Sequence, residues 1–178
     1  MTALWQRDAR DLASLIAAGQ VSSTEVVRTH LDRIDDINAT LNAIVAVLAD
    51  DALEAAGNID AALARGDDVG PLGGVPFTIK ENIDVAGQAT THGLGALKDA
   101  IAAVDAPIVE RMKGAGGIPL GRTNLPDMGL RIHTDSELHG LTHNPWHPGH
   151  TAGGSSGGEA SALASGMSPI GLGNDIGG

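Results

Sequence analysis

The chain has 178 residues, of which 42% are hydrophobic, and a formal net charge of -11. This length suits about one domain, and the apolar content is sufficient for a core. The acidic excess argues against nucleic acid or an anionic membrane as a partner, because both favour surfaces rich in Lys and Arg. The absence of cysteine excludes disulfides, thiol nucleophiles and thiolate metal sites. Neither a signal-peptide pattern nor a membrane-length apolar run is visible, so we expect a cytoplasmic protein.

Glycine divides the chain into two compositional parts. Residues 1–65 hold two glycines, whereas the other 23 of the 25 follow from residue 66 onward. We therefore expect a helical N-terminal region over residues 1–66. Residues 67–178 should form strands, turns and loops belonging to the same, incomplete, domain.

The N-terminal region contains three helix patterns and one strand pattern. Ser22 and Glu25 have the spacing of a capping box, which marks the start of the second helix. Apolar residues then recur with helical periodicity. The expected elements, in chain order, are a helix over Asp8–Ala18, a helix from Ser23 to about Ile37, a strand within Leu41–Leu48 and a helix over Ala49–Arg65.

The glycine-rich part alternates short apolar runs with helical segments. Such alternation indicates an α/β layer structure. The expected strands and helices are a strand over Pro76–Lys80, a helix over Ala106–Lys113, a strand over Ile118–Gly121, a helix starting near Gly158 and a short strand within Pro169–Leu172.

Lys80 ends an apolar strand, where a side chain leaves the core and enters a cleft. One interpretation is a surface lysine paired with the adjacent Glu81. The other is a partly desolvated lysine with a lowered pKa, whose neutral amine acts as a base. The residues alone leave both interpretations open.

Ser155 and Ser156 lie between two glycine pairs, where the backbone has unusual conformational freedom. They could form a Gly/Ser turn that caps the following helix. Alternatively, one of them could be a catalytic serine beside backbone N–H groups that bind an oxyanion. Spacing alone does not decide between these two interpretations.

Two other patterns resemble a dinucleotide-binding loop and a zinc site, but the residues between the key positions do not fit either motif. Gly171, Gly173 and Gly177 resemble a dinucleotide loop, but the spacing is G-x-G-x-x-x-G. His139, His143 and His147 recur every four residues, as zinc ligands on a helix would. Gly140 and Pro145 interrupt any such helix. A metal-dependent hydrolase that uses these histidines therefore remains the weakest alternative.

Five segments together resemble the amidase signature family in order and spacing, from about residue 70 to the end of the chain. The resemblance implies a serine hydrolase with a Ser-Ser-Lys triad, no cofactor, and an α/β fold whose mixed sheet is flanked by helices. The segments are Gly73–Asn82, Gly121–Asn124, His143–Trp146, Gly153–Gly158 and Gly171–Gly178.

The resemblance also implies the roles of individual residues. Lys80 matches the base and Ser155 matches the serine that relays a proton between lysine and nucleophile. Ser156 would support them by hydrogen bonding, and Asp175 matches a structural acid. Family members hold the relay serine through a cis peptide bond, here Gly154–Ser155. The family's oxyanion hole matches the backbone N–H groups of Ile176, Gly177 and Gly178.

By the same resemblance, the nucleophilic serine would directly follow Gly178. The chain would then be the N-terminal portion of an amidase, and we expect it to be inactive by itself. Asn174 departs from the Ser or Thr usual in the family. The expected partners are a small-molecule amide and, for the full-length protein, possible further copies of itself. The alternative from another class is a nonenzymatic binding or regulatory protein that keeps the amide cleft.

Overall fold

The computed structural model describes residues 2–176. Its elements alternate between helices and strands along most of the chain, as expected for an α/β fold. The longer helices are α1 (Ala9–Ala17), α2 (Ser23–Leu41), α3 (Ala49–Ala64), α4 (Pro107–Gly114) and α5 (Gly157–Ala164). Three 3-10 turns are η1 (Leu4–Gln6), η2 (Gly95–Leu97) and η3 (Asp127–Gly129). The strands are β1 (Ile44–Val47), β2 (Pro76–Lys80), β3 (Ile118–Thr123), β4 (Asp135–Ser136), β5 (Gly140–Leu141) and β6 (Gly171–Leu172).

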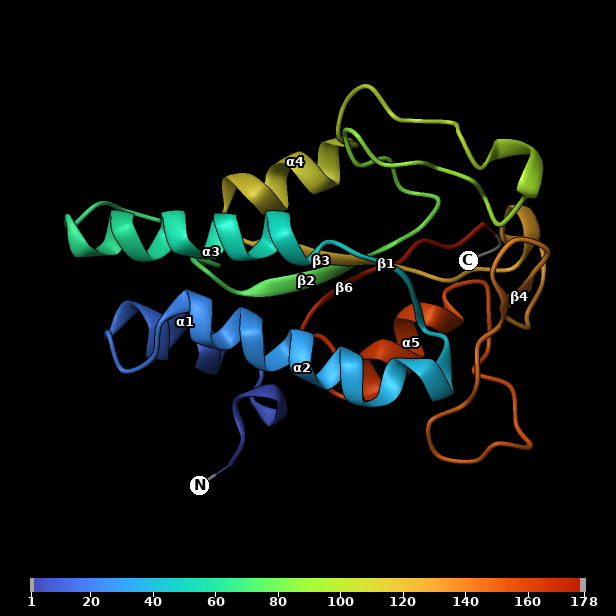
Figure 1. Ribbon diagram of the computed structural model, residues 1–178, viewed down its shortest axis with the longest axis horizontal. Coiled ribbons are helices and arrows are strands. Elements are labelled where there is room, and N and C mark those ends of the chain that lie inside the picture. The colour runs from blue at the N-terminus through green and yellow to red at the C-terminus, as the bar shows by residue number, and fades with distance from the viewer. Residues whose placement is uncertain (1, 177–178) are drawn as a thin grey trace.

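The main sheet has the strand order β1-β3-β2-β6. Strands β3, β2 and β6 run parallel, whereas β1 is antiparallel to β3. Helices α3 and α4 lie on one side of this sheet, and α1, α2 and α5 lie on the other (Figure 1). The expected mixed sheet flanked by helices is therefore confirmed. The carboxyl ends of β2 and β3 meet at one edge, where Lys80 pairs with Thr123.

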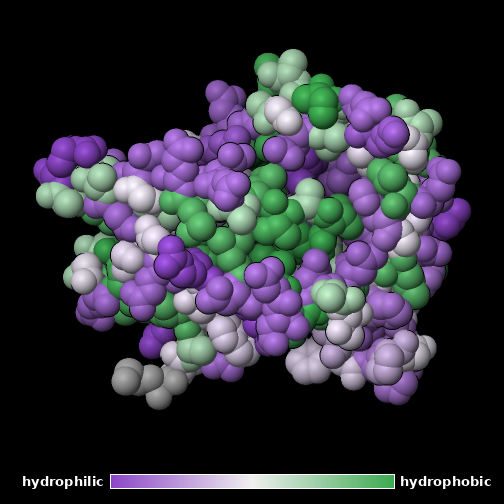
Figure 2. All heavy atoms as spheres, viewed as in Figure 1, coloured by the Kyte–Doolittle hydropathy of each residue, from purple (hydrophilic) through white to green (hydrophobic). Residues whose placement is uncertain are grey.

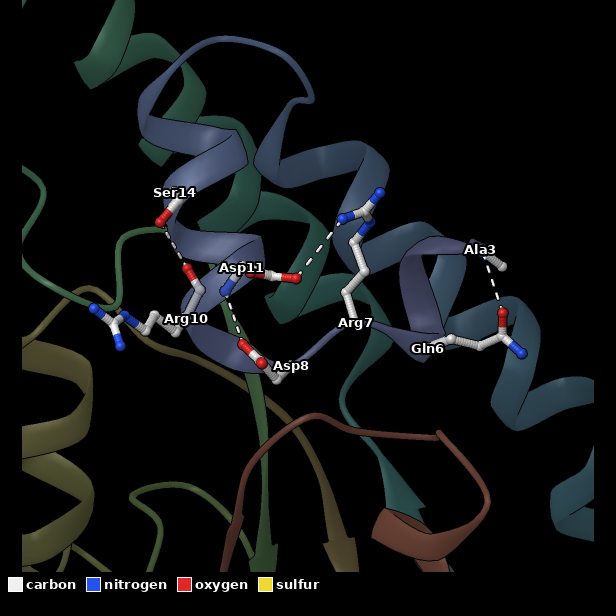
Figure 3. A network of polar contacts seen from close by, with 7 residues as sticks. All are labelled: Ala3, Gln6, Arg7, Asp8, Arg10, Asp11 and Ser14. Atoms are coloured by element: carbon white, nitrogen blue, oxygen red, sulfur yellow. Dashed lines mark hydrogen bonds and ion pairs between the residues drawn. The ribbon is translucent and has the colours of Figure 1, made fainter. Parts of the chain in front are cut away.

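Local side-chain contacts fix the start of α1. Asp8 precedes the helix, and its Oδ1 atom accepts a hydrogen bond from the backbone N–H of Asp11 at 2.8 Å (Figure 3). Asp11 also faces Arg7 across 3.7 Å. Ser14 donates to the carbonyl of Arg10 one turn below. The expected helix over Asp8–Ala18 is thus present, with Asp8 as its cap.

The second helix is longer than expected and shortens the strand that follows. Ser22 accepts from the N–H of Glu25 at 3.0 Å, so the predicted start is confirmed. The helix then continues to Leu41 and ends at Asn42, which has a left-handed φ of 50°. The strand consequently begins at Ile44 instead of Leu41. The Asn38 side chain stabilises this turn by accepting from the N–H of Ile44 at 2.9 Å.

Other boundaries in the second half differ by a few residues. Strand β3 extends to Thr123, beyond the expected end at Gly121, because it pairs with β2 up to Lys80. Strand β6 is only Gly171–Leu172. The two-stranded sheet of β4 and β5 was not expected, because each strand has only two residues, too few to show an alternation of apolar and polar side chains.

The largest buried cluster joins the two compositional parts. It combines Val27 and Ile34 of α2 with residues of α3, β1, β3 and α5, including Leu120 and Ala162. A second cluster surrounds Phe77 and packs β2 against α4. In the view of Figure 2, hydrophobic residues gather at the centre of the face, over the strands, with polar residues around them. The division of the domain near residue 66 stays a prediction.

None of the helices within residues 2–176 combines the length and the apolarity needed to cross a bilayer.

Candidate active site

Lys80 is completely buried at the carboxyl end of β2. Its Nζ atom lies 2.7 Å from Ser155 Oγ, although the two residues are 75 positions apart. Ser155 comes from the loop before α5, and the Gly154–Ser155 peptide bond is cis, as the family resemblance implied. Because Lys80 is buried and contacts a hydroxyl, the alternative of a solvated lysine paired with Glu81 is wrong.

Asn174 is the main contact of Lys80 that sequence reasoning missed. Its side-chain Oδ1 lies 2.8 Å from Lys80 Nζ, and its backbone carbonyl lies 3.2 Å away. Both oxygens accept hydrogen bonds and cannot donate. The Asn174 amide also donates to Asn82 at 3.1 Å, which orients its oxygen toward the lysine. The available signal for this contact was the position of Asn82 and Asn174, each two residues after the end of a strand, β2 and β6 respectively.

The environment of Lys80 acts on its pKa in two directions. Burial disfavours the charged ammonium and lowers the pKa below the ordinary lysine value. The nearby charge of Asp175 opposes this shift. The net direction is downward, so the site favours the neutral amine more than water does.

The Ser156 hydroxyl contacts the segment of Asn174 instead of the helix N-terminus. This hydroxyl donates to the backbone carbonyl of Asn174 at 3.1 Å, and it makes no side-chain cap on α5. The Gly/Ser turn thus precedes α5 with Ser156 at the N-cap position, but the Ser156 hydroxyl does not cap the helix. Its contact instead ties the serine loop to the end of β6.

Two small cavities flank Ser155. One of about 290 Å³ is lined by both serines, Asn174 and Asp175. The other, of about 270 Å³, is lined by Ser155, Asp175 and Ile176, together with the 129–132 segment. The side chain of Ile176 is largely exposed. The two remaining expected oxyanion-hole residues, Gly177 and Gly178, lie outside the described residues.

Glu159 is a second residue that sequence reasoning missed. It lies in the first turn of α5, is 4% exposed, and accepts hydrogen bonds from the hydroxyls of Thr78 and Thr123. Burial raises its pKa from 4.5 to about 7, against the opposing effect of these two hydrogen bonds. The available signal was a single charged residue within an otherwise uncharged helix, Gly157–Ala164.

A buried arginine holds the loop after β2. Arg122 of β3 donates to the carbonyl of Ile83 at 2.9 Å and also to that of Glu81. The Glu81 carboxylate accepts in turn from the N–H of Thr91. Burial lowers the pKa of Arg122, and the charges of Glu81 and Asp84 oppose that effect. These hydrogen bonds fix the backbone that directly follows Lys80.

The segment that contains His139, His143 and His147 is not helical, so these histidines do not align as zinc ligands on a helix would. Among residues 2–176, no group of three or more His, Cys, Asp or Glu side chains could hold a metal ion. The rings of His147 and His150 stack 4.3 Å apart within an exposed loop over residues 144–151. This loop is closed on itself, because the Asn144 amide donates to the carbonyl of Thr151 at 2.9 Å.

The sequence profile of the family described as Amidase matches residues 25–178. This match covers most of the chain, and the α/β fold agrees with it. The chain belongs to the amidase signature family.

Known relatives agree with this assignment. The chain is 50% identical over 175 residues to indoleacetamide hydrolase of Bradyrhizobium diazoefficiens, covering 98% of this chain and 33% of that protein. It is 41% identical over 167 residues to acylamidase of Rhodococcus erythropolis, covering 94% of this chain and 35% of that protein. A solved structure of 6-aminohexanoate cyclic dimer hydrolase matches with a TM-score of 0.86 and 34% identity, over 98% of this chain and 35% of the other.

The chain therefore spans about a third of the length of the curated relatives that it matches.

Proposed function

We propose that this chain is the N-terminal part of an amidase that cleaves a carboxamide C–N bond through a serine acyl-enzyme. The observation that carries the proposal is the 2.7 Å separation between buried Lys80 Nζ and Ser155 Oγ. A lysine is an effective base only when its amine is neutral, and burial lowers the pKa of Lys80 in that direction.

The hydrogen-bond partners of Lys80 suit a neutral amine. Such an amine has two N–H donors and one lone pair. The two oxygens of Asn174 are available to the donors, which leaves the lone pair for the hydroxyl proton of Ser155. An ammonium group has three donors and no lone pair, so it would oppose proton transfer from the serine.

The proposed reaction moves one proton along this chain of groups. Lys80 takes the Ser155 proton while Ser155 takes the proton of the nucleophilic serine, which we expect directly after Gly178. The nucleophile bonds to the amide carbon, the C–N bond breaks, and the departing amine takes up the proton held by Lys80. Water then cleaves the resulting ester by the same route, which releases the acid and restores the serine.

We assign the remaining residues supporting roles in this proposal. Ser156 holds the serine loop by its contact with Asn174, and Asp175 limits the downward shift of the Lys80 pKa. The backbone N–H groups of Ile176, Gly177 and Gly178 would stabilise the negative charge on the amide oxygen. The chain of 178 residues alone should not react, because it lacks the nucleophile.

A fluorophosphonate probe, which labels activated serines, tests the proposal. We expect the full-length gene product to be labelled, and the 178-residue chain to remain unlabelled. Lys80→Ala should slow labelling about 100- to 10,000-fold, the usual contribution of a general base. Lys98→Ala, at an exposed lysine, is the matched control and should label normally. Undiminished labelling of Lys80→Ala would remove the assigned base.

The alternative is a nonenzymatic binding protein that retains the cleft. The codon after Gly178 separates the two: a serine codon favours the amidase, whereas a stop codon favours the binding protein. Indoleacetamide is the first substrate to assay, because a relative that is 50% identical over this region is named for its hydrolysis.

A further inference from the structure

Glu159 connects the helix that follows the serine pair to the strand that carries Lys80. Helix α5 begins directly after Ser156, and Glu159 lies in its first turn. The Glu159 carboxylate accepts hydrogen bonds from Thr78 on β2 and, at 2.9 Å, from Thr123 on β3. Both threonines are completely buried. The carboxylate therefore joins α5 to two parallel strands at once.

The contact with Thr78 lies beside the contact of Lys80 with Ser155. Thr78 and Lys80 are two positions apart on β2, so their side chains leave the strand on the same face. Their partners, Glu159 and Ser155, belong to one short segment of chain. Strand β2 thus contacts this segment through two adjacent residues, Thr78 and Lys80. Loss of the Thr78 contact with Glu159 should therefore also displace Ser155 from Lys80.

The third neighbouring strand leaves the carboxylate no room to turn. Gly171 of β6 pairs with Thr78, and a Cβ atom at this glycine would overlap Glu159 Oε1. The absence of a side chain at position 171 creates the space that the carboxylate occupies. Its orientation is therefore determined by packing as well as by the two hydroxyls.

Stability alone does not account for a carboxylate in this position. Within residues 2–176, Glu159 forms no ion pair that would offset its burial. Burial of an unpaired carboxylate disfavours folding, and an apolar side chain of similar size would fill the space at less cost. The hydrogen bonds to Thr78 and Thr123 supply a fixed geometry, which an apolar side chain would not.

We propose that Glu159 is a positioning residue, which holds the first turn of α5 against β2 so that Ser155 Oγ stays within hydrogen-bonding distance of Lys80 Nζ. The expected effect of Glu159 on catalysis rests on the proposed amidase function. Its expected effect on the distance between Lys80 Nζ and Ser155 Oγ does not.

Kinetics of the full-length protein test the first consequence. We expect Glu159→Ala and Thr78→Val each to lower kcat per folded enzyme about 10- to 100-fold, with KM unchanged, because small displacements of reacting groups have effects of this size. The conservative variants Glu159→Gln and Thr78→Ser should restore most of the activity. The double variant of Glu159→Ala and Thr78→Val should be no slower than the slower single variant, since both changes remove the shared contact between Glu159 and Thr78.

Ser161→Ala is the matched control. Ser161 is buried in the same helix and donates to the carbonyl of His143 at 3.0 Å, so the variant loses a partly buried hydrogen bond that does not involve β2. We expect its kcat per folded enzyme to stay near the wild-type value. An equal loss of kcat in Ser161→Ala and Glu159→Ala would mean that Glu159 has only a structural role.

Crystal structures of the same variants test the geometry without any activity. In Glu159→Ala and Thr78→Val, the distance between Lys80 Nζ and Ser155 Oγ should exceed hydrogen-bonding range, whereas Ser161→Ala should keep it. A contact retained at 2.7 Å in both variants would overturn the inference. If Glu159→Ala does not fold, Thr78→Val decides the question. A wild-type protein that hydrolyses no amide would refute the proposed function, while these distances would still decide the role of Glu159.

Discussion

Gly158 at the start of α5 lies directly against the backbone of Asn124 at the end of β3. The N–H of Gly158 donates to the carbonyl of Asn124 at 3.2 Å. A Cβ atom at position 158 would overlap the N and O atoms of Asn124 and would lie 2.9 Å from the carbonyl oxygen of Ala43. All of these atoms belong to the backbone, so they cannot move aside as a flexible side chain could.

The first prediction follows from this close approach. Gly158→Ala should lower the free energy of unfolding by about 1–3 kcal/mol, the usual cost of overpacking. Gly57→Ala is the matched control, because Gly57 is also helical but a Cβ atom there would meet no neighbouring residue within 4 Å. We expect this control to be more stable by about 0.5–1 kcal/mol. Chemical denaturation of both variants measures the contrast, and similar effects would contradict the prediction.

The second prediction concerns the pH dependence of stability at Glu159. Its pKa is raised from 4.5 to about 7, so the folded state holds this proton more tightly than the unfolded state does. Stability contributed by the neutral acid is therefore lost as the pH rises through this range, with a maximum loss of about 3 kcal/mol. Glu159→Gln cannot ionise. We expect its stability relative to wild type to increase between pH 4.5 and 7 and then level off. A constant difference across that range would contradict the raised pKa.

The third prediction concerns the charge of Lys80. Because its pKa is lowered, the buried ammonium disfavours folding at low pH, and this cost disappears as the pH rises from the lowered pKa to the ordinary lysine value. The stability of wild type relative to Lys80→Met should therefore increase with pH over that interval. Fluorophosphonate labelling of the full-length protein should also accelerate as Lys80 loses its proton. A labelling rate that falls with pH in this interval would exclude the neutral amine as the base.

The fourth prediction uses the contact between Asn174 and Lys80. In Asn174→Asp a carboxylate would replace the neutral oxygen that lies 2.8 Å from the lysine Nζ. An adjacent opposite charge stabilises the ammonium, so the pKa of Lys80 should rise by about 1–3 units. The pH profile of labelling should move to higher pH by the same amount. Asn174→Ser keeps a neutral oxygen and serves as the control, with a profile near that of wild type. An unmoved profile in Asn174→Asp would show that another group controls the rate.

Local patterns predicted most of the secondary structure. Strand β2 has the expected bounds, and the Ser22 cap starts α2 where the spacing with Glu25 indicated. The end of α2 was misjudged, because Asn38 and Asn42 stabilise a late turn through contacts that periodicity does not reveal. Capping boxes and apolar periods are local, and a sequence displays them directly.

The site was less accessible to such reasoning. Lys80 and Ser155 were brought together by the family resemblance, since their own surroundings left both interpretations open. The family resemblance marks Asn174 only as a departure from the usual Ser or Thr, and no sequence pattern assigns a role to Glu159. Their contacts join positions 94 and 81 residues apart, and the pairing of β2 with β3 and β6 creates them. Contacts of this range depend on strand order, which no single segment specifies.

The closed loop over residues 144–151 provides a practical attachment point. Asn144 and Thr151 join its two ends, and residues 146–150 between them are exposed. Exposed loop tips tolerate insertions best, because few contacts depend on their conformation. A fluorescent label or an affinity tag placed between Pro148 and Gly149 would therefore leave the sheet and the contact between Lys80 and Ser155 undisturbed, and would allow the protein to be immobilised in one defined orientation.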